Sequence, residues 1–549
     1  MLGLVLAPLL LFLNAAISLD APVFVAIADR IVVAPLDPYG FEMAWDPTSP
    51  HVAEFNHNPP LLSYWLAPVV AVFGDWEPAL HAALLPFPLL AAFCFFGIAR
   101  RLAGDGLSPT VLLITTPAFL LLSTTLLLDV PVLAAFLAAL YALLRSNEGD
   151  FAGWEWIAGG AAAAAGLTKY AGFAVLPLLA AGLWLLPVAH ARLRSPGRWL
   201  RVIGVPLGVW AAWGALTYAL YGSVHYAGGV AMVGQRSFAS AQLLNQLSSV
   251  PIYYGGALLF PLFIWAERLL RARRGAELAV LGILVGAVVV TFILPTGEPP
   301  RRVPLGVEEA VLGALGFAGA VVVWGLGAWG DDPERRTPEH RFLVLWLGGF
   351  LVFSCFVNWH VTAADALMAA PPAILLCFRH AALRPAPRTV ALWAAGMFLF
   401  SLVLTASDVA QRNAYRTAAL RIVREIGDAP GRRWFVGQWG LQHYLARESF
   451  EPVLPSQYAR RYGQSELAVG DWVVSARNVA QLDVTRAMSP YGMKVFWRFE
   501  VPAQIGLRAT NPDAGAGFYS HRSGHVPFAF SLAPIEEFGL ARVTSVRRP

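Results

Sequence analysis

Long apolar stretches, separated by short polar connections, constrain the fold of this sequence more than any other feature. About thirteen of them have roughly the length of a membrane-crossing helix. Because 57% of the 549 residues are hydrophobic and only 14% are charged, the chain has too little polar surface for a water-soluble globule of this size. We therefore predict a polytopic α-helical membrane protein with about thirteen transmembrane helices. The stretches are residues 2–17, 79–98, 109–128, 130–144, 157–167, 170–186, 202–221, 251–265, 278–294, 310–329, 342–357, 367–378 and 389–405.

Arginine residues give these predicted helices a direction. They concentrate in every second connection, and the intervening connections hold few basic residues. Since cytoplasmic loops of membrane proteins carry the excess of Arg and Lys, we place the N-terminus in the cytoplasm. The predicted cytoplasmic side holds Arg100, Arg101, Arg145, Arg192, Arg194, Arg198, Arg201, Arg268, Arg271, Arg273, Arg274, Arg335, Arg336, Arg341, Arg379, Arg384 and Arg388. The opposite side holds Arg30, Lys169, Arg236, Arg301 and Arg302.

The predicted direction depends on how residues 157–186 cross the membrane. They could form one long tilted helix around Lys169 or two short passes. One pass would place most of the later arginines outside, so we predict two passes and a C-terminus on the outer side of a bacterial inner membrane. Residues 2–17 lack a basic n-region and a small-residue cleavage site, so we expect them to remain as the first helix and not to be removed as a signal.

The chain becomes far more polar after residue 407. The patterns favour helices at residues 412–426 and 439–446 and short buried strands at residues 433–436 and 471–474. We therefore predict a transmembrane domain over residues 1–407 and a small soluble α/β domain over residues 408–549, outside the membrane. The second domain shows no nucleophile–base pair and no glycine-rich phosphate loop, which indicates an accessory or acceptor-facing role.

The first outer loop, residues 19–78, is long for a connection between packed helices, and loops of this length are usually functional. It carries Asp20 directly after the first apolar stretch and the run EFNHNPPLLSYW, which contains His57 and Tyr64. Residues 61–73 are apolar but short, so we expect a helix lying in the membrane interface. A solvated loop that caps a transporter is the alternative for most of its acids. These acids include Asp20, Asp29, Asp37, Glu42, Asp46 and Glu54.

Two ionisable residues interrupt apolar sequence. Asp129 lies in TTLLLDVPVLAAF and Lys169 lies in GLTKYAGF. A charged side chain in a membrane is expensive without a partner, so a functional role is the first hypothesis for each. The alternatives are contact with interfacial water at a helix end for Asp129 and snorkelling toward the membrane surface for Lys169.

The order of these motifs resembles the GT-C superfamily of membrane glycosyltransferases. An Asp after the first helix, the HNPPLLSYW run, an Asp-Val-Pro after the third helix and a GLTK run before the sixth are similar to its protein-mannosyltransferase and lipid A aminoarabinose-transferase branches. The resemblance covers most of residues 2–405, and the runs GRRWFVGQWGLQHYL and GFYSHRSGHVPFAF are similar to the outer domain of bacterial members. It implies a GT-C-like fold and transfer of a sugar, with inversion, from a polyprenyl-phosphate donor to a lipid, glycan or protein acceptor.

The resemblance also implies roles for individual residues. Asp20 is the expected catalytic base, which would orient or deprotonate the acceptor. Lys169 is the expected partner of the departing lipid phosphate, with Arg236, or Arg301 and Arg302, as helpers. Further residues expected to line the substrate site are His57, Tyr64, Asp129 and His360.

Metal, disulfide and nucleic-acid sites find little support. Some GT-C enzymes use a divalent metal, but no ligand cluster here has suitable spacing, so we assign no metal ligand and leave a divalent metal open. Cys94, Cys355 and Cys377 all lie in apolar sequence and are expected to be packing residues. The net charge of +5 comes from scattered arginines without a basic block, so we expect no nucleic-acid partner.

Two departures from the family pattern keep other functions open. Many relatives carry a second acid after the first-loop Asp, where this chain has Ala21. Many also carry an Arg-Tyr pair before the twelfth helix, where this chain has Asp365 and Ala366. An inactive scaffold that keeps the fold is therefore one alternative, and a transporter or lipid flippase is another. Transporters often contain internal repeats, and this sequence shows no clear repeat, so glycosyl transfer is the leading hypothesis.

Overall fold

The computed structural model of the chain divides into two compact units. The helical unit comprises Met1–Leu11, Leu84–Thr405 and Leu507–Ser531, and the mixed unit comprises Phe12–Ala83, Ala406–Gly506 and Leu532–Pro549. These units interleave along the chain, whereas the two predicted domains are continuous, so the domain boundary at residue 407 stays a prediction. The structure describes residues 2–46, 49–149, 151–189, 195–234, 240–261, 263, 337–379, 384–454, 466–479, 488–524 and 526–546.

Within the described residues, five helices are long and apolar enough to cross a membrane. This finding agrees with the predicted class of polytopic membrane protein, but the count of about thirteen passes is not confirmed. The predicted stretches at residues 278–294 and 310–329 lie outside the described residues. The five helices are Glu77–Leu102, Asp129–Glu148, Pro196–Tyr221, Pro338–Val357 and Pro387–Ile426.

Helix breaks explain why some predicted passes are shorter than expected. The stretch at residues 109–128 divides into α7 (Leu107–Thr115) and α8 (Pro117–Ser123). Thr116 between them is extended, as a residue before proline prefers, and its hydroxyl caps the second helix by accepting a hydrogen bond from the Phe119 N–H (3.2 Å). The first helix, α1, covers only Leu2–Leu11, so the predicted pass over residues 2–17 ends earlier than expected.

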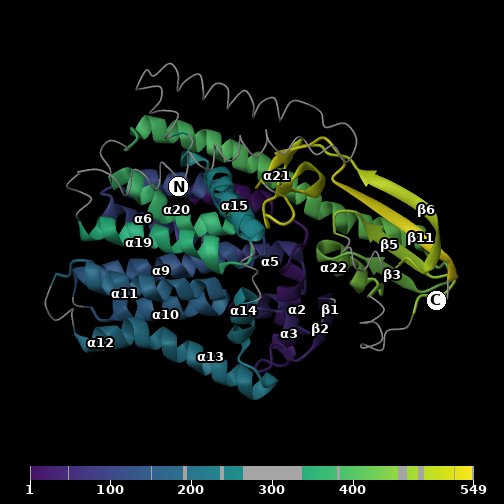
Figure 1. Cartoon of the computed structure of the whole chain (residues 1–549), viewed down its shortest axis with the longest axis horizontal. Coiled ribbons are helices and arrows are strands. Elements are labelled where there is room, and N and C mark those ends of the chain that lie inside the picture. The colour runs from purple at the N-terminus through teal and green to yellow at the C-terminus, as the bar shows by residue number, and fades with distance from the viewer. Residues whose placement is uncertain are drawn as a thin grey trace. The chain divides into compact units, whose positions relative to one another are not determined.

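The core of the helical unit is built around α10, which is rich in alanine and glycine. Small residues let neighbouring backbones approach closely, and a Cβ atom on Gly159 would lie 2.2 Å from the Arg201 carbonyl oxygen. Helix α10 packs against α9 and α13 (Figure 1). The remaining helices of this unit are α6 (Pro86–Leu102), α9 (Asp129–Glu148), α10 (Gly153–Thr168), α11 (Val175–Leu185), α12 (Pro196–Trp199), α13 (Val205–Tyr221), α14 (His225–Gly234), α15 (Ser240–Leu258), α19 (Pro338–Val352) and α20 (Ala363–Arg379).

A five-stranded sheet forms the C-terminal part of the mixed unit, in the strand order β4-β3-β5-β11-β6. Strand β3 is parallel to β4 and β5, and β11 is antiparallel to β5 and β6. Apolar side chains cover both faces, with Phe435 and Val474 in one core cluster and Trp434 and Val473 in another. The strands are β3 (Arg433–Val436), β4 (Glu451–Pro452), β5 (Trp472–Ala476), β6 (Tyr491–Val501) and β11 (Glu536–Val546). Figure 1 labels β3, β5, β6 and β11.

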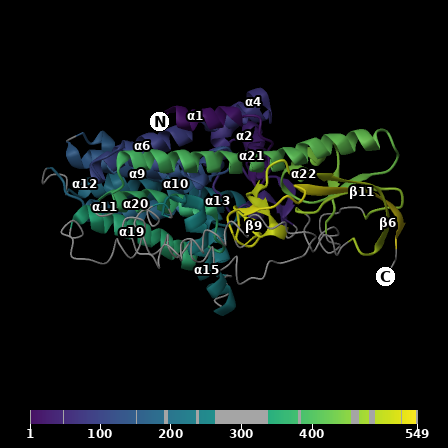
Figure 2. The same cartoon turned by 90° about the horizontal axis from the view of Figure 1, so that it is seen from above.

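Two helices accompany this sheet. Helix α21 runs without a break from Pro387 to Ile426, as Figure 2 shows, and its last part belongs to the mixed unit. Helix α22 (Trp439–Arg447) follows strand β3. The predicted helix at residues 439–446 and the two predicted strands are therefore confirmed to within two residues at each end. The predicted helix at residues 412–426 has the right end but not the right start, because it continues the predicted last pass at residues 389–405 in one helix.

The predicted first outer loop, residues 19–78, contains the helix expected at residues 61–73 and further regular structure that the sequence did not predict. The apolar run after Asp20 forms α2, which packs against α4, and the Ser63 hydroxyl donates to the Phe24 carbonyl oxygen (2.9 Å). The polar pair Asp29 and Arg30 inside α2 hid its apolar face from the sequence pattern. The elements are α2 (Ala21–Val33), β1 (Glu42–Asp46), β2 (Ser49–His51), α3 (Val52–Phe55), α4 (Leu61–Phe73) and α5 (Glu77–Leu84).

Candidate active site

Lys169 and Asp129, which the sequence singled out separately, form an ion pair in the helical unit. The Lys169 Nζ atom lies 2.7 Å from Asp129 Oδ1. Asp129 is the first residue of α9, where the positive end of the helix dipole favours a carboxylate. Its side chain is 12% exposed, whereas that of Lys169 is 36% exposed. An ammonium group has three N–H donors and can therefore contact more than one acceptor.

Lys169 lies at a break between two helices. It is extended (φ −151°, ψ 137°), and a short 3-10 helix at Tyr170–Ala174 separates α10 from α11. The chain turns tightly here, because a Cβ atom on Gly172 would lie 2.2 Å from the Ala165 carbonyl oxygen. Only glycine fits such a close approach. The helix break that the sequence predicted at this lysine is therefore confirmed.

A second polar segment, residues 358–362, connects a π-helical turn at Phe353–Val357 to α20. Turns of this kind frequently occur at functional sites. The buried Gln246 side chain donates to the carbonyl oxygens of Ser354 and Asn358, at 2.7 Å in each case. The amide thereby satisfies backbone acceptors that the wide turn leaves without a helical partner, and it fixes where the loop begins.

Asp365, at the position where the resemblance led us to expect arginine, closes the same loop. Its carboxylate accepts hydrogen bonds from the Asn358 side-chain amide (3.0 and 3.1 Å) and from the Thr362 backbone N–H (2.9 Å). The Thr362 hydroxyl is also within 3.3 Å. The carboxylate thereby satisfies donors at the start of α20.

His360 lies in this loop, with its ring 3.9 Å from that of Trp359. Its Nδ1 atom is buried and lacks a hydrogen-bond partner among the described residues. Burial, and to a smaller extent the positive charges of Lys169, His521 and Arg522, lower the pKa of His360 to about 3. At physiological pH His360 is therefore a neutral hydrogen-bonding group and not a cation.

Residues 517–524, from the C-terminal part of the chain, belong to the helical unit and pair with the loop. The His521 N–H donates to the Val361 carbonyl oxygen, and the Val361 N–H donates to His521 Nδ1, both at 2.9 Å. The exposed Arg522 guanidinium lies 4.6 Å from the centre of the Trp359 ring, which is a cation–π geometry. Arg522 therefore adds a permanent positive charge beside the loop.

The sequence did not place His521 or Arg522 in the site. The signal was present as the run HRSGH, which has two histidines and one arginine within five residues. We assigned the run HRSGH to a separate outer domain. Its contact with residues 359–361 could not be predicted, because hydrophobic periodicity carries no information about contacts between distant segments.

Asp20, the predicted base, belongs to the mixed unit and is exposed, whereas the five residues before it are buried. It occupies the N-cap position of α2, where the helix dipole favours an ionised carboxylate, and its side chain makes no capping hydrogen bond. Leu19, directly before it, has φ +57°. A buried non-glycine residue in this left-handed conformation is strained, and such strain clusters at functional sites.

His57 and Tyr64 also belong to the mixed unit. The Tyr64 hydroxyl donates to the Pro35 carbonyl oxygen (2.5 Å), so it holds the segment that follows α2. His57 is half-buried and precedes Asn58, whose carbonyl oxygen accepts a hydrogen bond from Tyr39 (2.8 Å). A substrate-binding role for either residue stays a prediction.

The remaining predicted groups cannot be located in the same way. Arg236, Arg301 and Arg302 lie outside the described residues. In the part of the chain that the structure describes, no group of three or more His, Cys, Asp and Glu side chains is arranged to hold a metal ion. The structure thus brings together Asp129, Lys169 and His360 in one unit and Asp20, His57 and Tyr64 in the other.

Comparison with known proteins gives matches of two kinds. Two solved structures of ArnT from Cupriavidus metallidurans match the chain at 17% sequence identity. The structure in the apo state has a TM-score of 0.47 and covers 99% of this chain and 97% of its own. The structure bound to undecaprenyl phosphate has a TM-score of 0.48 and covers 100% and 98%. No curated protein matches.

The second kind of match is to a family model. Residues 57–215 match the family described as dolichyl-phosphate-mannose-protein mannosyltransferase. This segment contains His57, Tyr64, Asp129 and Lys169. The resemblance to membrane mannosyltransferases, first inferred from the motifs, is therefore confirmed over residues 57–215.

Proposed function

We propose that this protein transfers a sugar from a polyprenyl-phosphate donor to a lipid, glycan or protein acceptor at the outer face of a bacterial inner membrane. The observation that carries the proposal is the Lys169 ammonium, which stands at a helix break, pairs with Asp129 and lies in the segment matching the mannosyltransferase model. By its description that family uses dolichyl-phosphate mannose, which is a sugar joined to a polyprenyl phosphate.

Different residues would act on the leaving group and on the acceptor. Departure of the lipid phosphate develops negative charge, which the Lys169 ammonium and the Arg522 guanidinium would stabilise. Asp129 holds the ammonium in place, and the neutral His360 offers a hydrogen bond to a phosphate or sugar oxygen. Asp20 would orient the acceptor and take its proton as the sugar moves.

Reconstituted protein and radiolabelled donors test this proposal. The wild type, in vesicles with a panel of polyprenyl-phosphate sugars and an extract of cell-envelope acceptors, should move label from at least one donor to an acceptor. Lys169→Ala should lower this rate by about a hundredfold or more, because an electrostatic contact to the leaving group is lost. Lys494→Ala is the matched control, since Lys494 on β6 is the only other lysine in the chain.

The outcomes separate the proposal from its alternatives. Equal losses in both lysine variants would remove Lys169 from the leaving-group role. Absence of transfer from every donor, with the fold intact, would favour an inactive scaffold. Movement of a labelled lipid between leaflets without sugar transfer would favour a flippase.

The proposed orientation has the N-terminus in the cytoplasm and the mixed unit's C-terminal sheet outside. It is supported by the arginines of alternate connections. An alkaline phosphatase fused after Pro549 should be active, because this enzyme requires an oxidising compartment. Activity of a cytoplasmic reporter at the same position would overturn the orientation.

A further inference from the structure

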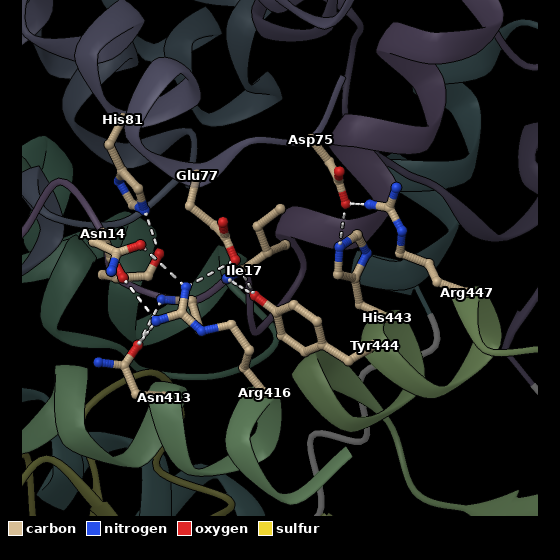
Figure 3. Close-up of polar contacts among 12 residues, drawn as sticks. Asn14, Ile17, Asp75, Glu77, His81, Asn413, Arg416, His443, Tyr444 and Arg447 are labelled. Carbon is tan, nitrogen blue, oxygen red and sulfur yellow. Dashed lines mark hydrogen bonds and ion pairs between the residues drawn. The ribbon is translucent and has the colours of Figure 1, made fainter. Parts of the chain in front are cut away.

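The nine residues between α1 and α2 lead directly to Asp20 without forming a helix over their last stretch. Ala15, Ala16 and Ile17 are almost fully buried. Buried backbone groups must find hydrogen-bond partners, and those outside a helix or sheet must take them from elsewhere. Here the partners are side chains from distant parts of the mixed unit, drawn in Figure 3.

Backbone N–H groups of this segment are bound by two side chains from the C-terminal half of the chain. The Ala16 N–H donates to Asn413 Oδ1 on α21 (2.9 Å), and the Ile17 N–H donates to the Tyr444 hydroxyl on α22 (2.9 Å). The Tyr444 hydroxyl in turn donates to Glu77 Oε1 (2.9 Å). Tyr444 therefore connects the segment before Asp20 to the start of α5.

Arg416 joins the same network from α21. Its guanidinium donates to the side-chain and backbone oxygens of Asn14 (3.2 Å each) and to Glu77 Oε1 (3.0 Å). A planar guanidinium can hold several acceptors in one geometry, as an ammonium cannot. Glu77 thus receives hydrogen bonds from both Arg416 and Tyr444 and neutralises the arginine.

The packing leaves this segment little room to move. A Cβ atom on Gly440, in the first turn of α22, would lie 2.9 Å from the Ile17 carbonyl oxygen. Beyond Ile17 come only Ser18 and the strained Leu19 before Asp20. A left-handed leucine persists only when its surroundings determine the backbone on both sides.

We propose that Tyr444, Arg416 and Glu77 are positioning residues that fix the backbone before Asp20 and so set the direction of its carboxylate. This inference rests on the proposed role of Asp20 as catalytic base. It gives the C-terminal α/β part of the mixed unit a task in catalysis, because α21 and α22 supply two of the three groups. None of the three needs to touch substrate.

The first measurement does not depend on activity. Hydrogen exchange of peptides covering residues 12–20 should accelerate in Tyr444→Phe, which removes the partner of the Ile17 N–H, and in Arg416→Gln. Tyr415→Phe is the matched control, because it removes a hydroxyl of the same kind, which is buried and donates to Glu536 (2.9 Å). Unchanged exchange in Tyr444→Phe and Arg416→Gln would overturn the proposal, whatever the protein's activity.

The second measurement separates positioning from simple stability. Tyr444→Phe should lower kcat by about ten- to a hundredfold and leave KM for the donor nearly unchanged, since small misplacements of a catalytic group cost rate. Tyr415→Phe should keep kcat. Faster exchange with unaltered kcat would contradict the positioning role. Absence of transfer by the wild type would instead count against the proposed function, and the exchange result would still decide whether the three residues hold the segment.

Discussion

The Lys169 ammonium and the Asp129 carboxylate lie 2.7 Å apart and join a helix break to the first turn of α9. Each residue alone would be a costly charge in apolar surroundings. As a pair they stabilise each other, and the Lys169 side chain is 36% exposed. The pair therefore makes a charged site compatible with a membrane-embedded fold.

Breaking this pair from one side should destabilise the protein more than removing both charges. Lys169→Met leaves the nearly buried Asp129 carboxylate without its cation and should lower the free energy of unfolding by about 1–3 kcal/mol, less than for a fully buried pair because Lys169 is partly exposed. The double variant Lys169→Met/Asp129→Leu should recover part of the loss. Thermal melting in detergent measures both, and additive losses would show that the pair contributes no coupling.

Arg522 should matter for donor binding and little for folding. Its guanidinium is exposed over Trp359, so Arg522→Ala should raise KM for the donor by about tenfold, the effect expected from losing one charge-assisted contact. The effect should shrink at high salt. Arg498→Ala, an exposed arginine on β6, is the control, and a similar rise of KM in that variant would argue against a specific role for Arg522.

The sequence correctly predicted individual features in both units. Strand β3 at Arg433–Val436 and helix α4 at Leu61–Phe73 have the predicted bounds, since each is a clear apolar run bounded by glycine, proline or polar residues. These two inferences use information within a few neighbouring residues. The break at Lys169 followed instead from the placement of arginines along the whole transmembrane sequence.

What the sequence missed depends on contacts between distant segments. The hydrogen bond between Val361 and His521 joins residues 160 positions apart, and no periodic pattern encodes it. Helix α2 was missed for a local reason, because Asp29 and Arg30 interrupt its apolar run. The network around Tyr444 was invisible for both reasons, as its members are polar residues spread over more than four hundred positions.

His443 should make stability depend on pH. Its Nε2–H donates to Asp75 Oδ2 (3.1 Å), near Arg447 and Glu77, and burial lowers the pKa of His443 from 6.5 to about 4 in spite of the raising effect of Glu77. At pH values between about 4 and 6.5, His443 is protonated in the unfolded chain and neutral in the folded chain. Stability is therefore full above about pH 6.5 and falls as the pH drops toward 4, by up to about 3 kcal/mol.

The variant His443→Gln should show a flatter melting temperature between pH 4.5 and 7 than the wild type. His51→Gln is the control, since His51 is exposed on β2. Equal slopes in the wild type and His443→Gln would exclude His443 as the titrating group.

The most direct test of the central proposal is sugar transfer by the reconstituted wild type compared with Asp20→Asn. We expect transfer from a polyprenyl-phosphate sugar by the wild type and by Asp29→Asn, an exposed acid on the same helix. Asp20→Asn should be slower by about a hundredfold or more, the usual contribution of a general base. Undiminished transfer by Asp20→Asn would contradict the assignment of the base, and no transfer by the wild type from any such donor would contradict the proposed function itself.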